Sequence, residues 1–91
     1  MDQVAKHITF SGEVQGIGFR FTALNVATQY HLTGYVRNLP NGMVEMLAQG
    51  PAQDIDDCIR NLQESFAGYV RETKTEDAAF DPKHKGFKIT F

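Results

Sequence analysis

The sequence predicts an α+β fold in which two helices cover one face of an antiparallel sheet. Three observations support this prediction: short stretches where apolar residues alternate, two longer stretches with the apolar spacing of a helix, and a strong hairpin turn. The 91 residues are enough for one hydrophobic core, so we expect a single domain that spans residues 1–91.

A strand and a helix are predicted at the start of the chain. Apolar residues alternate from Val4 to Phe10, as they do in a strand with one buried face. The pattern from Arg20 to Tyr30 is helical, and Gly34 follows soon after its end, as glycine often does after helices. The predicted buried stripe of this helix consists of Leu24, Ala27 and Tyr30.

Two strands joined by a tight turn are predicted next, from Tyr35 to Leu39 and from Met43 to Ala48. The segment between them, Pro40-Asn41-Gly42, favours a hairpin because Asn-Gly readily adopts positive φ angles at both central positions. Apolar residues alternate along the returning strand, on one face of which lie Val44, Met46 and Ala48.

The last part of the chain is predicted to hold a second helix and two strands. Gly50-Pro51 opens the helix, because proline is well tolerated near a first helical position. The apolar face of this helix consists of Ile55, Cys58, Ile59, Leu62 and Phe66. A strand from Tyr69 to Thr75 has the weak, polar pattern of a sheet edge. After a loop at 81–86, a short last strand contains the alternating Phe87, Ile89 and Phe91.

The predicted order of elements is therefore βαββαβ, followed by a short extra C-terminal strand. Two βαβ halves of this kind form a ferredoxin-like sandwich, an antiparallel sheet with two helices on one face. In this fold the loop at residues 12–19 lies at one end of a central strand and leads into the first helix.

Composition narrows the class of protein. A formal net charge of −2 argues against a general nucleic-acid binder, which needs clustered positive charge. No apolar run is long enough to cross a bilayer, and residues 1–7 lack the apolar core of a signal peptide. The single cysteine, Cys58, can form no intrachain disulfide. We therefore expect a cytoplasmic protein that binds neither nucleic acid nor membrane.

The segment 12–20 carries the strongest functional signal. It places three glycines between a strand and a helix, and it ends on Arg20. Glycines let successive amides turn toward one point, while a helix N-terminus adds free donors and a positive dipole end. Arg20 adds a permanent charge and a planar fork that suits phosphate. The pattern predicts a phosphate-binding cradle, although a simple strand-to-helix turn has the same composition. It lacks the Gly-Lys-Ser/Thr ending of a nucleotide-binding loop.

A second polar group lies at the end of the strand before the hairpin. The amide of Asn38 can accept a hydrogen bond from water and donate one to an oxygen. An asparagine beside a turn more commonly satisfies local backbone, so this residue is no site by itself. Arg37 is expected on the opposite face of the strand as a solvated surface charge.

Two motifs together closely resemble the acylphosphatase family over essentially the whole chain. The first is Gly12-x-Val14-Gln15-Gly16-Ile17-Gly18-Phe19-Arg20. The second is Gly34-Tyr35-Val36-Arg37-Asn38-Leu39-Pro40-x-Gly42-x-Val44-Glu45, followed by Gly50-Pro51. The resemblance implies an enzyme that hydrolyses the carboxyl–phosphate bond of acyl phosphates to a carboxylate and inorganic phosphate, without a metal. We expect a monomer that needs no cofactor.

The same resemblance implies a role for each matching residue. Arg20 corresponds to the arginine that binds the phosphate and Asn38 to the asparagine that orients the attacking water. The cradling backbone corresponds to Glu13, Val14, Gln15, Gly16, Ile17, Gly18 and Phe19. The family usually has arginine where this chain has Glu13, and a like charge about 6 Å from the phosphate costs on the order of 3 kcal/mol at an effective dielectric near 20. If Glu13 points outward, solvent screens it.

The other reactive side chains form no catalytic constellation. Cys58 is expected in the core, and the three histidines have no metal-ligand spacing. An acyl phosphate needs little more than positioning and charge stabilisation, because its carboxylate leaves without protonation. The alternatives are a non-catalytic anion-binding domain of the same fold, an RNA-binding module, and an accessory domain of a larger enzyme. An RNA-binding module needs a basic sheet with exposed aromatics, which this chain lacks, and we expect a stand-alone protein.

Overall fold

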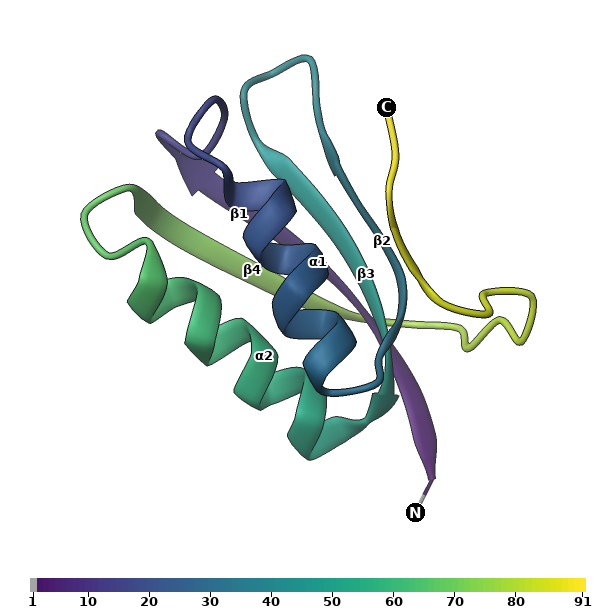
Figure 1. The fold of residues 1–91 in the computed structure, drawn as a ribbon. Helices are drawn as coiled ribbons and strands as arrows, with labels where there is room; N and C mark the ends of the chain where they lie inside the picture. The colour runs from purple at the N-terminus through teal and green to yellow at the C-terminus, as the bar shows by residue number, and fades with distance from the viewer. Residues whose placement is uncertain (1) are drawn as a thin grey trace.

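The computed structural model describes residues 2–91, in which two helices pack on one face of a five-stranded sheet (Figure 1). The elements are β1 (Gln3–Gly12), α1 (Phe19–Gln29), β2 (Thr33–Asn38), β3 (Val44–Pro51), α2 (Ala52–Ser65), β4 (Val70–Ala78) and β5 (Phe87–Ile89). This order confirms the predicted ferredoxin-like sandwich with an extra last strand. Neither helix in this part of the chain is long and apolar enough to cross a membrane.

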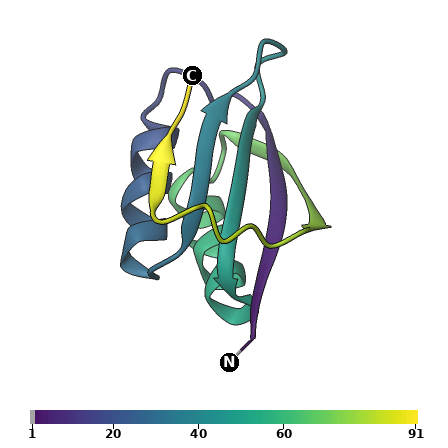
Figure 2. The same ribbon diagram turned by 90° about the vertical axis from the view of Figure 1, so that its right-hand side faces the viewer.

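The strands lie in the order β4-β1-β3-β2-β5. The first four pair antiparallel, and β4 lies at an edge, as its polar pattern predicted. β5 instead pairs parallel to β2, with Phe87 opposite Gly34, so the complete sheet is mixed. A crossover at residues 79–86 joins β4 at one edge of the sheet to β5 at the other edge, and it passes over the open face of the sheet (Figure 2).

Gln49 anchors this crossover on β3. Its side chain is only 1% exposed. Its Nε2 donates to Thr33 Oγ1 and to the carbonyl oxygen of Asp81, each at 3.0 Å, while its Oε1 accepts from the Asp81 amide at 2.8 Å. A buried amide with all these partners is well satisfied. It holds the start of the crossover in place, and thereby helps to set where β5 begins.

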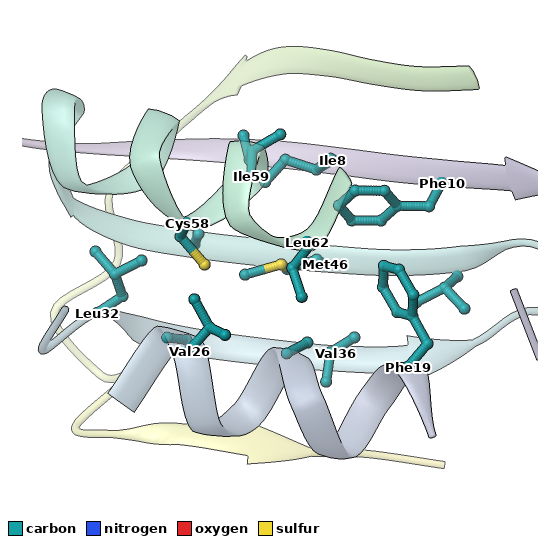
Figure 3. Packing of buried hydrophobic residues seen from close by; sticks show 14 of the residues in the cluster. Ile8, Phe10, Phe19, Val26, Leu32, Val36, Met46, Cys58, Ile59 and Leu62 are labelled. Atoms are coloured by element: carbon teal, nitrogen blue, oxygen red, sulfur yellow. The ribbon is translucent and has the colours of Figure 1, made fainter. Parts of the chain in front are cut away.

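The core lies between the helices and the sheet (Figure 3). The Phe19 ring lies 4.8 Å from those of Phe10 and Phe66, so the first turn of α1 is fixed against β1 and the end of α2. Cys58 is fully buried, as predicted, and burial raises the pKa of its thiol to about 12. Such a thiol is inert at neutral pH.

Two predictions about apolar residues were wrong in detail. The buried residues of α1 are Phe19, Ala23, Val26 and Ala27. Leu24 and Tyr30 are only half-buried, because the buried stripe follows the helical face that contains Phe19, whose ring lies in the core. Phe91 lies beyond β5 and is 98% exposed, so it is not part of the last strand.

The open face of the sheet carries an ion-pair network centred on Glu45 of β3. Arg37 Nε donates to one carboxylate oxygen of Glu45, and His7 Nε2 donates to the other at 2.8 Å. Arg37 is exposed on the surface, as predicted, and in addition it pairs with Glu45. Burial raises the pKa of the Glu45 carboxyl, but the hydrogen bonds from His7 and Arg37 outweigh this and lower it overall.

Candidate phosphate-binding site

A cavity of about 210 Å³ opens where β1 leads into α1. The loop before α1, the turn between β2 and β3 and the segment after β5 lie at this end of the molecule (Figures 1 and 2). The cavity is lined by Val14, Gly16, Gly18, Phe19, Arg20, Phe21, Asn38, Ile89 and Phe91. The structure thus brings together the two predicted catalytic side chains, Arg20 and Asn38, although 18 positions separate them in the sequence.

Backbone amides near this cavity have no protein partners. From Val14 to Phe21, no backbone N–H donates to an acceptor within residues 2–91. The first helical hydrogen bond of α1 is the one that the Thr22 N–H donates to the Gly18 carbonyl oxygen at 3.1 Å. Gly16 and Gly18 take φ angles of 80° and 81°, which side chains disfavour, and no side chain caps α1. Free donors at the positive end of a helix form a natural binding site for an anion.

Not every residue of the predicted cradle faces the cavity. Glu13 has an exposed side chain, and its amide donates to the Tyr69 carbonyl at 2.9 Å. The Glu13 amide is therefore already paired, and its carboxylate does not line the cavity. Gln15 and Ile17 do not line it either, whereas Val14, Gly16, Gly18 and Phe19 do.

Arg20 supplies the positive charge of the cavity. It is half-buried in the first turn of α1, and the ring of Phe91 lies 5.3 Å from its guanidinium carbon. No carboxylate forms an ion pair with Arg20 in the part of the chain that the structure describes. Contact with an aromatic face leaves the guanidinium its hydrogen-bond donors, so its fork can bind an anion.

Asn38, at the end of β2, lines this cavity and carries an unusual polar atom. Its Oδ1 is buried and accepts no hydrogen bond, and it is the one buried side-chain oxygen or nitrogen without a partner in residues 2–91. An unsatisfied buried acceptor costs about 1–3 kcal/mol. Native structures retain few such atoms, and those they retain often serve a function. This oxygen can accept a hydrogen bond from a water molecule beside the amide cradle.

Sequence reasoning missed the role of the Gln15 side chain. Its Nε2 donates to the carbonyl oxygen of Leu39 at 2.8 Å and to that of Met43 at 2.9 Å. These two carbonyls belong to the turn between β2 and β3, so Gln15 ties the loop before α1 to the hairpin that carries Asn38. Only the backbone of this residue had been predicted to matter.

Three apolar residues of the cavity were also missed: Phe21, Ile89 and Phe91. Ile89 reaches the site because β5 pairs parallel to β2, with Ile89 opposite Val36. The alternation of Phe87, Ile89 and Phe91 signalled a strand but not its partner. Within residues 2–91, no group of three or more His, Cys, Asp and Glu side chains is arranged to hold a metal ion.

Comparison with known proteins agrees with this geometry. Residues 6–89 match the family model for acylphosphatase. The chain is 44% identical over 89 residues to an acylphosphatase of Alcanivorax borkumensis, covering 93% of this chain and 97% of that one. It is 36% identical over 89 residues to an acylphosphatase of Vibrio parahaemolyticus, covering 98% and 99%. The crystal structure of acylphosphatase from Bacillus subtilis superposes with a TM-score of 0.88 at 28% identity, covering 97% and 99%. This chain belongs to the acylphosphatase family.

Proposed function

We propose that this protein hydrolyses acyl phosphates at the cavity between Arg20 and Asn38, releasing a carboxylate and inorganic phosphate. One observation carries the proposal: partnerless amides, an unpaired arginine and a partnerless amide oxygen meet in a single cavity. The first two suit a phosphoryl group and the third suits a water molecule. The family membership, and the activity that names the relatives, support the same function.

In this proposal the phosphoryl group binds to amides between Val14 and Phe21 and to the guanidinium of Arg20. These donors hold the non-bridging oxygens and stabilise the charge on them in the transition state. The donors are fixed before substrate arrives, because Phe19 anchors the first turn of α1 in the core. Little reorganisation is then needed during the reaction.

Asn38 holds the attacking water in the proposed mechanism. Its Oδ1 accepts a hydrogen bond from the water, whose oxygen attacks phosphorus in line with the bond to the acyl oxygen. The P–O bond to the acyl group breaks, and the carboxylate leaves with the electron pair. The proton of the water passes to a phosphate oxygen, so the chain needs no separate base. The leaving carboxylate is stable at neutral pH, so no acid is needed.

Hydrolysis of benzoyl phosphate at neutral pH, in the presence of a chelator, tests this proposal. We expect metal-independent turnover, and we expect Arg20→Gln to reduce kcat by at least about 10²–10³-fold. The same change should weaken inhibition by inorganic phosphate. Arg60→Gln is the matched control, because Arg60 lies on the surface of α2 and should leave turnover unchanged.

Near-normal turnover in Arg20→Gln would show that Arg20 is not the phosphate ligand. A folded wild type without turnover would instead favour the non-catalytic anion-binding domain. Titration calorimetry of the wild type and of Arg20→Gln with inorganic phosphate would then measure how tightly that domain binds the anion.

We further propose that residues 1–91 act as a single-domain monomer in the cytoplasm. The cavity brings the proposed phosphate ligand Arg20 and the proposed water ligand Asn38 together within one chain. The only cysteine is buried, which suits a reducing compartment. Light scattering on the purified protein should give the mass of one chain, 10.2 kDa.

A further inference from the structure

The mouth of the cavity carries two large apolar side chains that solvent reaches. Phe21 is 64% exposed and Phe91 is 98% exposed, and both line the cavity. The other large exposed apolar residues among those described, Tyr69 and Phe80, do not line it. Single exposed apolar residues are ordinary, but two that border one anion-binding cavity suggest an apolar ligand group.

These side chains are placed next to the position proposed for the phosphate. Phe21 directly follows Arg20 in the first turn of α1, and the ring of Phe91 contacts the Arg20 guanidinium. Ile89 of β5 is half-buried and adds a third apolar surface. When amides and Arg20 hold the phosphate, the acyl group is the part of the substrate left to meet this surface.

Charge on the cavity wall points to the same kind of acyl group. Among the lining residues Arg20 is the one charged side chain, and the phosphate occupies it in the proposed mechanism. A carboxylate or second phosphate on the acyl group would find no free cation there. Burying such a charge against Phe21 and Ile89 without a partner is unfavourable.

We propose that Phe21, together with Ile89 and Phe91, forms an apolar platform for the acyl group. The protein then prefers acyl phosphates with an apolar, aromatic acyl group over those with a small or a charged one. This inference rests on the proposed function. It assigns Phe21 as the residue that determines which acyl groups the enzyme prefers. Aromatic rings favour offset or edge-to-face contacts with other rings, which Phe21 offers at low entropic cost.

Three substrates test the platform: benzoyl phosphate, acetyl phosphate and 4-carboxybenzoyl phosphate. After correction for the rates of uncatalysed hydrolysis, we expect wild-type kcat/KM to be about tenfold higher for benzoyl phosphate than for either of the others. In Phe21→Ala the preference over acetyl phosphate should be largely lost. Phe21→Leu, which retains an apolar surface, should recover part of it.

Phe80→Ala is the matched control, because Phe80 is an exposed phenylalanine on the crossover and outside the cavity. It should keep the wild-type ratio. Phe21 is the better test residue than Phe91, since loss of Phe91 would also remove a contact to Arg20. The exposure of Phe21 means that its loss should leave circular dichroism and thermal unfolding unchanged.

The outcomes separate this inference from the function on which it rests. Turnover with an unchanged substrate ratio in Phe21→Ala would overturn the platform alone. An equal fall for benzoyl and acetyl phosphate would also overturn it, because Phe21 would then act through the phosphate site. Absence of turnover with all three substrates in the folded wild type would overturn the proposed function, and the platform with it.

Discussion

Two side-chain amides in this protein, those of Gln49 and Asn38, have opposite hydrogen-bonding environments. Gln49 makes hydrogen bonds with Thr33 and Asp81, whereas the Oδ1 of Asn38 makes none. The first is a structural anchor, because each of its bonds joins two parts of the fold. The second costs stability, and that cost is expected where a group must bind something from outside the chain.

Removal of Asn38 should therefore separate catalysis from stability. We expect Asn38→Ala to reduce kcat for benzoyl phosphate by about 10²–10³-fold. Inhibition by inorganic phosphate should stay close to normal, because the amides and Arg20 remain. The free energy of unfolding should change by less than about 1 kcal/mol, since an unsatisfied oxygen is removed. Steady-state kinetics and urea denaturation measure both effects.

Gln49→Leu provides the contrasting control for Asn38→Ala. It leaves the Asp81 amide and the Thr33 hydroxyl without their partner, so the free energy of unfolding should fall by about 2 kcal/mol. A large loss of phosphate affinity in Asn38→Ala, with normal turnover, would make Asn38 an anion ligand instead.

At the residue scale, the sequence could single out Arg20 and Asn38 because the two motifs that contain them together resemble one family. It could not locate partners that come from far along the chain. The Glu13 amide is occupied by Tyr69, and the Gln15 side chain binds carbonyls beyond β2. Both contacts form only after the strands pair, so no local pattern in the sequence predicts them.

At the scale of elements, the cavity depends on how the loop before α1 meets the β2–β3 hairpin. The side chain of Gln15 makes this connection with two hydrogen bonds. Asn38 lies one residue before Leu39, whose carbonyl accepts one of these bonds. The position of Asn38 relative to the amide cradle is therefore set in part by Gln15.

Loss of the Gln15 amide should loosen this connection. We expect Gln15→Met, which preserves length, to lower kcat for benzoyl phosphate about tenfold, because small misplacements of a positioning group reduce rate strongly. The inhibition constant of inorganic phosphate should change less than kcat. Gln63→Met, at an exposed position of α2, is the control. Equal losses in kcat and phosphate affinity would mean that Gln15 supports the cradle itself rather than Asn38.

Most elements were predictable because their patterns are local. The hairpin turn, the apolar face of α2 and the polar edge strand β4 each follow from neighbouring residues. The partner of β5 does not, because its three residues, Phe87–Ile89, carry no signal that distinguishes a parallel neighbour from an antiparallel one. The crossover that decides this is held by Gln49, which lies far from it in the sequence.

On the scale of the whole molecule, the two faces of the sheet have different chemistry. One face is covered by the two helices and forms the core, while the other carries the ion pairs of Glu45 with His7 and Arg37. The Glu45 side chain is only 13% exposed, so its charge depends on these partners. Stability should therefore depend on pH through this residue.

Glu45→Gln should show this dependence. The pKa of Glu45 is lower in the folded chain than in the unfolded chain, where it is about 4.3. The unfolded state thus binds the proton more tightly, and the stabilisation is complete above the unfolded pKa and is lost as pH falls through the folded pKa. We expect the variant to be less stable by about 1 kcal/mol at pH 7. This difference should shrink as pH drops below about 4.

Urea denaturation at a series of pH values measures the difference. Glu64→Gln, an exposed position on α2, should show a small difference that varies little with pH. A gap between wild type and Glu45→Gln that widens in acid would contradict the assigned direction of the pKa shift.

The strand order also has a consequence for how the chain reaches its native state. In residues 2–91, β2 and β3 are the one pair of neighbouring strands that also follow each other directly in the sequence. Every other pair of neighbouring strands is separated by a long stretch of chain. This stretch must close into a loop before the two strands can pair, which slows folding. The cavity combines Arg20 from α1, Asn38 from β2 and Ile89 from β5, so it exists only once these distant segments have met. The appearance of turnover during refolding would thus report the completed topology, not merely collapse or helix formation.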